Sequence, residues 1–198
     1  MSLETPIAEN IANHFVTLKP LAVDEADSYL EIGHDPEIWR YLAPEPFTNR
    51  GDAVNWVKGM LKRSDRSGEV PYSIYDNASG KLAGSSSYLD VRVDHGGLEI
   101  GFTWYGKDFQ RTYVNTATKL ALLENAFDKL GANRVQLQTD SRNQASRSAI
   151  ERLGAESEGI LRSHKIYPDG YIRDSAMYSI IVSEWPVIKE RLKKLLRR

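Results

Sequence analysis

The 198-residue sequence contains no cysteine. This absence excludes a disulfide framework, a cysteine-based zinc site and a thiol nucleophile, and it suits a reducing compartment. No apolar run approaches the roughly 20 residues that a membrane span requires. The first ten residues, MSLETPIAEN, have neither a basic region nor an apolar stretch. We therefore expect no signal peptide, no membrane partner and a cytoplasmic protein.

Metal-ligand spacing is also missing. The four histidines, at positions 14, 34, 95 and 164, form no His-x-x-x-His or similar cluster. We therefore expect chemistry that requires no metal.

Positive and negative residues nearly balance over the whole sequence, but the C-terminal end has an excess of positive ones. The net charge is −1, but the last ten residues carry six basic residues and one acidic residue, which leaves the rest of the chain near −6. This balance disfavours a nucleic-acid binder. We interpret the tail as a solvated amphipathic helix over 184–198, with its cations at the helix C-terminus, and not as an RNA-binding or membrane-binding segment.

The remaining composition is that of an ordinary globular protein, with 41% hydrophobic and 27% charged residues. The length predicts a single domain over 1–198, with a core of about 13–186. Strand-like and helix-like patterns alternate throughout, so we predict an α/β fold, in which helices pack on a mixed sheet. Expected strands cover 14–21, 70–75, 82–93, 98–105, 134–140, 156–167 and 171–182, and expected helices cover 24–33, 36–42, 49–63, 113–130, 141–153 and the basic tail.

Polar residues before several helices predict where those helices begin. Asp24, Asp35 with Pro36, Asp140 or Ser141, and Ser183 stand at expected N-caps, because their side chains can accept from free first-turn N–H groups. Gly131 and Gly154 stand at expected C-terminal stops.

The 98–105 segment, LEIGFTWY, alternates in the manner of a strand. Strict alternation puts Leu98, Ile100, Phe102 and Trp104 on one face, and it puts Glu99, Gly101, Thr103 and Tyr105 on the other.

The segment 109–119, FQRTYVNTATK, lies between that strand and the longest helix. A helix N-terminus there would present free N–H groups and the positive end of the helix dipole, which suit a phosphate. Arg111 adds a cation, and Thr112, Asn115 and Thr116 add neutral donors. The segment contains no glycine, so it matches neither a Walker A loop nor a dinucleotide fingerprint.

From 98 to 155 the sequence resembles the GNAT superfamily of acyl-CoA N-acetyltransferases, most of all its RimJ/RimL-like branch. The resemblance extends over roughly 13–186. Its motifs occur in family order: the Glu99-Ile100-Gly101 strand, the Gln110-led loop, Asn115, Thr139-Asp140, Asn143-x-x-Ser146, Arg152-Leu153-Gly154-Ala155, Arg173-Asp174 and Tyr178-Ser179. One departure is that Tyr113 and Asn115 stand where the family loop usually has small residues, chiefly glycine, and such side chains would narrow a phosphate cradle.

The resemblance implies a GNAT fold with a mostly antiparallel central sheet, and acetyl-CoA as cosubstrate in a cleft between two splayed strands. An amine attacks the thioester directly, without a metal. The implied acetyl-CoA contacts are Thr103, Trp104, Gln110, Arg111, Thr112, Tyr113, Val114, Asn115, Thr116, Asn143 and Ser146. The early aromatic stripe, Trp39, Tyr41, Trp56 and Met60, is mostly core, although in this superfamily its helices wall the acceptor site.

Three residues are candidates for catalysis. Glu99 is the first candidate base, through water if needed, against the alternative of a salt-bridged strand residue. His164 is the second, because an imidazole titrates in a useful range, against the alternative of a surface or core histidine. Ser146 would support the leaving thiolate, against the alternative that it and Asn143 only cap a helix. Asp140 fits a cap better than a catalyst.

Three functions compete. The leading one is acetyl transfer to a primary amine, on a protein N-terminus or a small molecule. The alternatives are an acyl-CoA sensor of GNAT fold without turnover and a ribosome- or RNA-associated protein that uses the basic tail. The sequence identifies neither the amine acceptor nor the oligomeric state, so a homodimer stays open.

Overall fold

Eight strands form one sheet in a computed structural model that describes residues 3–43 and 45–197. The strand order is β1-β2-β3-β4-β5-β6-β8-β7, and every neighbouring pair is antiparallel except β5 and β6. The strands are β1 (Ile11–Ala12), β2 (Val16–Pro20), β3 (Val70–Asp76), β4 (Leu82–Arg92), β5 (Gly97–Tyr105), β6 (Arg134–Asp140), β7 (Glu156–Ile166) and β8 (Ile172–Ile181). The predicted α/β class with a mostly antiparallel sheet is confirmed.

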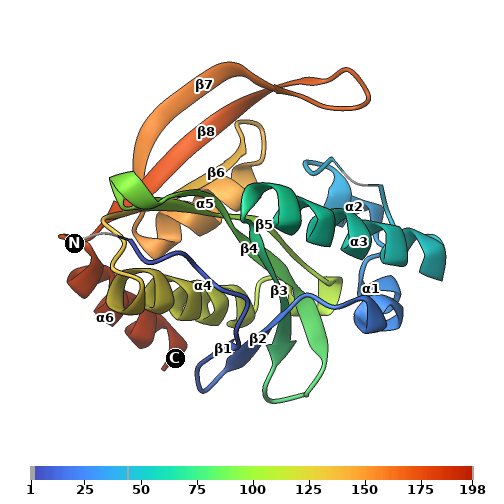
Figure 1. Cartoon of the computed structure of the whole chain (residues 1–198), viewed down its shortest axis with the longest axis horizontal. Coiled ribbons are helices and arrows are strands. Elements are labelled where there is room, and N and C mark those ends of the chain that lie inside the picture. The colour runs from blue at the N-terminus through green and yellow to red at the C-terminus, as the bar shows by residue number, and fades with distance from the viewer. Residues whose placement is uncertain (1–2, 44, 198) are drawn as a thin grey trace.

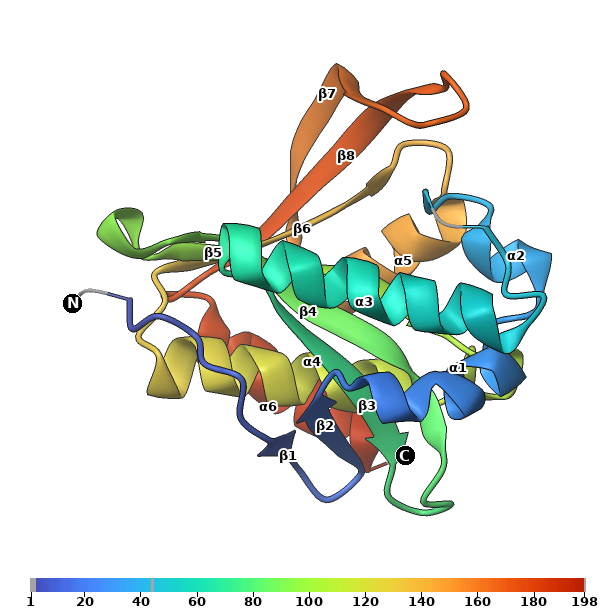
Figure 2. The same cartoon turned by 45° about the vertical axis from the view of Figure 1, so that its right-hand side comes forward.

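Helices cover both faces of this sheet (Figures 1 and 2). They are α1 (Ala26–Ile32), α2 (Pro36–Trp39), α3 (Arg50–Ser67), α4 (Val114–Glu124), α5 (Gln144–Leu153) and α6 (Trp185–Leu196). Side chains of α4, α5 and α6 share one buried apolar cluster with the sheet, and those of α1, α2 and α3 form a second. A π-helical turn, Asn125–Lys129, extends α4 to the predicted end of the long helix. No helix in the described ranges is long and apolar enough to cross a membrane.

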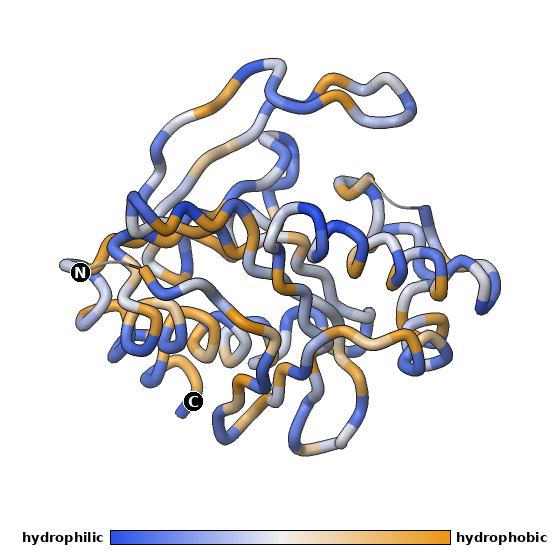
Figure 3. Tube along the Cα trace, viewed as in Figure 1, coloured by the Kyte–Doolittle hydropathy of each residue, from blue (hydrophilic) through white to orange (hydrophobic). Residues whose placement is uncertain are grey.

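The α3 helix shows how local sequence sets an element. Asn49 accepts a hydrogen bond from the Asp52 amide, and the Asp52 side chain accepts one from the Asn49 amide, which is a capping box. Ala53, Val57 and Met60 are buried on one side, and the tube in Figure 3 alternates between hydrophobic and hydrophilic turns along this helix. The helix ends at Gly68 in a left-handed conformation, one turn beyond the predicted Arg63.

The cap predictions at Asp24 and Ser183 are wrong. Asp24 lies inside a 3₁₀ turn, Val23–Glu25, and the Glu25 carboxylate takes the capping role by accepting from the Ala22 amide. Glu184, not Ser183, precedes α6, and its carboxylate accepts from the Ile181 amide. In both places the glutamate that follows the predicted cap residue has a longer side chain, which reaches back to a free backbone N–H.

The cap predicted at Asp140 or Ser141 is also wrong. Asn143 caps α5, where its side chain accepts from the Ser146 amide. Asp140 instead accepts hydrogen bonds from the Arg142 backbone and guanidinium. The predictions at Asp35 and Gly154 are confirmed, since Asp35 accepts from the Glu37 amide and Gly154 ends α5 at φ 105°.

The alternation predicted for β5 fails at a bulge. Ser87 pairs with Gly101 but Ser85 pairs with Trp104, so β5 has one extra residue, and Phe102 has φ 46°. Leu98, Ile100 and Tyr105 therefore face the α4 cluster, whereas Phe102 and Trp104 join the α1–α3 cluster. The extra residue reverses the side of every side chain after it, which is why Phe102 and Trp104 do not share the face of Leu98.

The bulge depends on close backbone approach at Gly84. A Cβ added there would lie 2.1 Å from the Trp104 carbonyl oxygen. We expect Gly84→Ala to lower the free energy of unfolding by about 2–3 kcal/mol, since overpacking against backbone has no flexible neighbour to yield. Urea unfolding would measure this change.

Gly59→Ala is the matched control, because Gly59 lies within α3 and an added Cβ would meet nothing within 4 Å. This variant should gain about 1 kcal/mol from helix propensity. Equal stability of the two variants would contradict the close approach.

Candidate active site

Strands β5 and β6 diverge after a short parallel pairing, and we refer to the region between their diverging ends as the β5–β6 cleft. Their parallel pairing joins only Gly97–Glu99 to Arg134–Gln136. Beyond those residues β5 stays paired with β4 and β6 stays paired with β8. The bulge at Phe102 bends β5 in the unpaired stretch. The sheet is therefore split at this point, between the two helix layers.

Glu99 stands at the point of divergence and is 4% exposed. Its Oε2 accepts hydrogen bonds from Gln136 Nε2 at 2.9 Å and from Gln138 Nε2 at 2.6 Å. Its Oε1 accepts no hydrogen bond from the described residues. A Cβ added to Gly101 would lie 2.8 Å from this oxygen. Two neutral amides thus fix the carboxylate in place, and one oxygen is left for a water or an amine.

His164 lies on β7, near this carboxylate. Its side chain is exposed, and its Nδ1 forms a 2.9 Å hydrogen bond with Ser175 Oγ. Partial desolvation, with the positive charges of Lys165 and Arg173, lowers the pKa of His164, and the charge of Glu99 opposes that shift. The lowered pKa favours the neutral imidazole, which is the form that a base requires.

The loop before α4 offers donors for an anion. Gln110 Nε2 donates to the Tyr105 carbonyl at 3.0 Å and anchors the loop to the end of β5. Within the described ranges, the amides of Tyr113, Asn115 and Thr116 donate to no protein group. Arg111 is exposed, with φ 60° and no ion pair in those ranges. Free N–H groups, a helix dipole and a cation are thus present together, as predicted.

The two side chains that replace glycine in the loop are held by other parts of the protein. The Tyr113 hydroxyl donates to Asp76, and its ring packs 5.8 Å from that of Phe15. Asn115 Oδ1 accepts a 3.2 Å hydrogen bond from the Tyr105 hydroxyl. Both side chains therefore tie the loop to neighbouring strands.

The N-terminus of α5 places two other predicted acetyl-CoA contacts, Asn143 and Ser146, near the end of β6. Asn143 is half-buried and engaged in the cap, so its carbonyl oxygen is occupied. The Ser146 hydroxyl is half-buried and has no hydrogen-bond partner among the described residues. Arg152 of the same helix donates to Thr116 Oγ1 at 3.1 Å, which links α5 to the first turn of α4.

Lys119 is a site residue that our sequence reasoning missed. It is 4% exposed on α4, and its Nζ donates to Thr103 Oγ1 at 2.7 Å. Desolvation lowers the pKa of Lys119 to about 7, and the charge of Glu99 opposes the shift. A signal was present, because Lys119 occupies a helix position four residues before the buried Leu123, on the predicted core face.

Lys165, Arg173 and Gln138 were also missed as site residues. Lys165 and Arg173 are directly opposite each other on β7 and β8. Arg173 Nη2 approaches Gln138 Oε1 at 3.5 Å, and Gln138 in turn binds Glu99. Only the pairing of β6 with β8 and of β8 with β7 brings these three together, and the sequence does not reveal that order.

The aromatic stripe is divided between core and cleft. Trp39 and Met60 are buried, and the Trp39 ring packs at a tilt against that of Trp104, with ring centroids 4.8 Å apart. Tyr41 is half-buried and differs from them, since its carbonyl accepts from the Tyr167 hydroxyl of the β7–β8 hairpin. The loop after α2 therefore reaches that hairpin.

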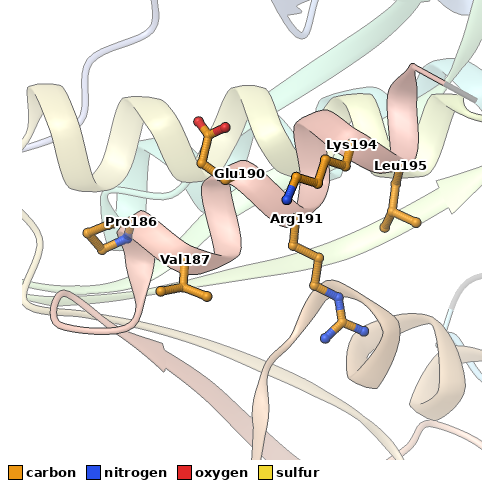
Figure 4. Close-up of a pocket in the computed structure, with 6 residues that line it drawn as sticks. All are labelled: Pro186, Val187, Glu190, Arg191, Lys194 and Leu195. Atoms are coloured by element: carbon orange, nitrogen blue, oxygen red, sulfur yellow. The ribbon is translucent and has the colours of Figure 1, made fainter.

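A depression of about 610 Å³ lies elsewhere, on α6 (Figure 4). All its lining residues belong to that helix: Pro186, Val187, Glu190, Arg191, Lys194 and Leu195. It shares no residue with the β5–β6 cleft.

Comparison with known proteins agrees with this geometry. Residues 16–156 match the family model described as an acetyltransferase (GNAT) domain. The "Putative ribosomal N-acetyltransferase YdaF" of Bacillus subtilis (strain 168) is 32% identical over 178 residues, which cover 87% of this chain and 94% of YdaF.

Two solved structures share the fold. A GCN5-related N-acetyltransferase from Brucella melitensis superposes with a TM-score of 0.91 at 27% identity, over 98% of this chain and 87% of that one. RimJ of Mycobacterium smegmatis, in complex with CoA-disulfide, has a TM-score of 0.75 at 21% identity, over 92% and 90% of the two chains. The similarity to YdaF supports the RimJ/RimL-like branch, and RimJ shares the fold. The split sheet and these similarities lead to one conclusion: the chain belongs to the GNAT family of N-acetyltransferases.

Proposed function

We propose that this protein transfers the acetyl group of acetyl-CoA to a primary amine in the β5–β6 cleft. The observation that carries the proposal is the buried carboxylate of Glu99 at the point where β5 and β6 separate. The free amides before α4 follow the same strand, so a single extended molecule can reach both places. The pyrophosphate lies on those amides and beside Arg111, and the pantetheine runs between the strands toward Glu99.

The reaction forms one bond and breaks one. The amine nitrogen bonds to the thioester carbonyl carbon, and the carbon–sulfur bond breaks. Glu99 Oε1 takes the amine proton, directly or through one water. Backbone amides near Thr103 and Trp104 stabilise the oxyanion. The Ser146 hydroxyl donates to the departing thiolate, and solvent restores its proton.

His164 is the competing base, because its lowered pKa favours the neutral imidazole and it lies within the electrostatic reach of Glu99. We favour Glu99, since it is buried at the divergence of the strands and His164 is exposed. The similarity to YdaF, a putative ribosomal N-acetyltransferase, makes a ribosomal amine one acceptor to test, beside small-molecule amines.

Acetyl transfer is tested by CoA release with acetyl-CoA and a panel of amines, with products identified by mass spectrometry. Thermal unfolding with acetyl-CoA, CoA or RNA accompanies it, because a ligand of the folded state raises the melting temperature. We expect acetyl-CoA to raise it and at least one amine to be acetylated. Stabilisation by acetyl-CoA without turnover of any amine would favour a sensor, and stabilisation by RNA alone would reject the proposal.

Arg111→Ala should weaken CoA binding about tenfold or more, because hydrogen bonds to a charged group contribute about 1.5–3 kcal/mol. Isothermal titration with CoA measures the dissociation constant. Lys58→Ala is the control, since Lys58 is exposed on α3 and outside the loop. An unchanged dissociation constant in Arg111→Ala would place the pyrophosphate elsewhere.

A further inference from the structure

Two cations face each other beside the cleft. Lys165 of β7 and Arg173 of β8 form a directly opposed cross-strand pair. Side chains at such positions lie on the same face of the sheet, and like charges there destabilise the pairing. Arg173 is also only 7% exposed, so water compensates little of its charge.

No acid in the described ranges forms an ion pair with either cation. The nearby carboxylates are engaged with other groups. Glu69 accepts two hydrogen bonds from Arg63, at 2.7 and 2.9 Å, and Asp140 accepts from Arg142.

Two further carboxylates, those of Asp174 and Glu99, are also hydrogen-bonded to other groups. Asp174 accepts from the Ser163 amide, and Glu99 accepts from two glutamine side chains. The protein therefore brings two positive charges to the cleft, and the charge of Glu99 acts on Lys165 without forming an ion pair with it.

The donors of Arg173 are incompletely used. Nη1 donates to the Tyr167 hydroxyl at 3.0 Å and Nη2 approaches Gln138 Oε1 at 3.5 Å. Nε is buried and has no partner among the described residues. Buried polar groups are nearly always hydrogen-bonded, so an unpaired guanidinium nitrogen indicates a missing acceptor.

The position of this pair relates it to the amine. Gln138 contacts Arg173 through its oxygen and Glu99 through its nitrogen, so one side-chain amide separates the guanidinium from the proposed base. Burial lowers the pKa of Lys165, the charge of Glu99 opposes that shift, and the positive charge of Arg173 lowers the pKa further. A bound anion would oppose the lowering, as Glu99 does.

We propose that Arg173 and Lys165 bind a carboxylate of the acceptor, so the substrate is an amine with a carboxylate close to its nitrogen. This inference rests on the proposed acetyl transfer. Two sources have this chemistry, a free α-amino acid and a peptide with an acidic residue after its N-terminal amine. Polyamines and aminoglycosides, which are cationic, are disfavoured by the same two charges.

The test compares acceptors that differ only in a carboxylate. Alanine is compared with alaninamide, and the dipeptide amide Ala-Glu with Ala-Gln. We expect kcat/KM to favour the acid at least tenfold in one pair, because a hydrogen bond to a charged group is worth tenfold or more in affinity. A higher kcat/KM for alanine than for alaninamide identifies free amino acids as the acceptors, and a higher kcat/KM for Ala-Glu than for Ala-Gln identifies acidic peptides. If the acid is favoured in neither pair, the proposal is overturned.

Variants assign that preference to the two residues. Lys165→Gln and Arg173→Gln should each reduce the acid-to-amide ratio of kcat/KM toward one. Lys165→Gln is the primary variant, because Lys165 is half-buried and its replacement disturbs folding less than that of buried Arg173. Arg162→Gln is the matched control, since it removes an exposed positive charge from the same hairpin and should keep the ratio. An unchanged ratio in Lys165→Gln overturns the assignment.

A binding measurement separates this inference from catalysis. Calorimetry with CoA present compares the N-acetylated acid and amide of each pair as product ligands. We expect the acid to bind at least tenfold more tightly in one pair. Tighter binding of the acid without turnover of any amine would reject the acetyl transfer and keep the anion site, whereas equal binding within both pairs would reject the anion site.

Discussion

Glu99→Gln should lower kcat by about 100- to 10,000-fold, which is the usual effect of removing a general base. The substitution preserves shape and removes basicity. The carboxylate is buried, and its Oε1 accepts no hydrogen bond from the described residues. This oxygen is therefore available to accept the amine proton, and the glutamine amide would not take over that role. Steady-state kinetics across the pH range would measure this loss.

His164→Ala is the control for the identity of the base. We expect it to change kcat much less than Glu99→Gln does, and Ser146→Ala to lower kcat with little effect on the KM of the amine. If Glu99→Gln keeps a near-normal kcat at every pH while His164→Ala loses it, His164 is the base. If neither variant loses activity, solvent accepts the proton and the enzyme acts mainly by positioning.

Lys119→Met should change how stability depends on pH. Desolvation lowers the pKa of Lys119 to about 7 in the folded protein, whereas an unfolded lysine titrates near its ordinary value of about 10.4. Between these values the unfolded state binds more protons, so the free energy of unfolding of the native protein rises with pH. One pKa unit corresponds to about 1.4 kcal/mol, so the Lys119 contribution should rise by about 3 kcal/mol between pH 7 and about pH 9.5.

Urea unfolding of both proteins across this range gives the difference. Lys119→Met removes the titrating group and keeps most of the apolar volume, so its stability should exceed that of the native protein most at pH 7 and below. Lys129→Met is the control, because Lys129 is exposed and its replacement should leave the slope unchanged. A pH-independent difference between native protein and Lys119→Met would show that Lys119 stays charged in the folded state.

Local signals predicted the elements well wherever the deciding contacts lie within a few residues. Asp35 caps α2 and Gly154 ends α5, as their residue types indicate, and β7 and β8 lie within the expected strands 156–167 and 171–182. The cap at Asp24 failed because Glu25 competes for the same N–H, and residue type alone does not rank two neighbouring acids.

The site was predictable in part. Glu99, Asn143 and Ser146 were found through resemblance to a family, and His164 was found through the titration range of imidazole. The loop from Gln110 to Thr116 was indicated both by the resemblance and by its place before a helix. The structure brings these residues to the ends of β5 and β6 and the adjoining hairpin. Their roles stay predictions. Lys119, Lys165 and Arg173 are charged residues whose meaning depends on burial and on strand order, which periodicity does not supply. The bulge at Phe102 was missed for the same reason, since the close contact of Gly84 with Trp104 is a tertiary contact.

A crystal structure of the complex with acetyl-CoA tests the central claim most directly. We predict that the pantetheine lies between β5 and β6, that the thioester carbonyl lies beside Glu99 and that the pyrophosphate accepts from the amides of Tyr113, Asn115 and Thr116. Acetyl-CoA bound outside the cleft, for example in the depression on α6, would contradict the claim.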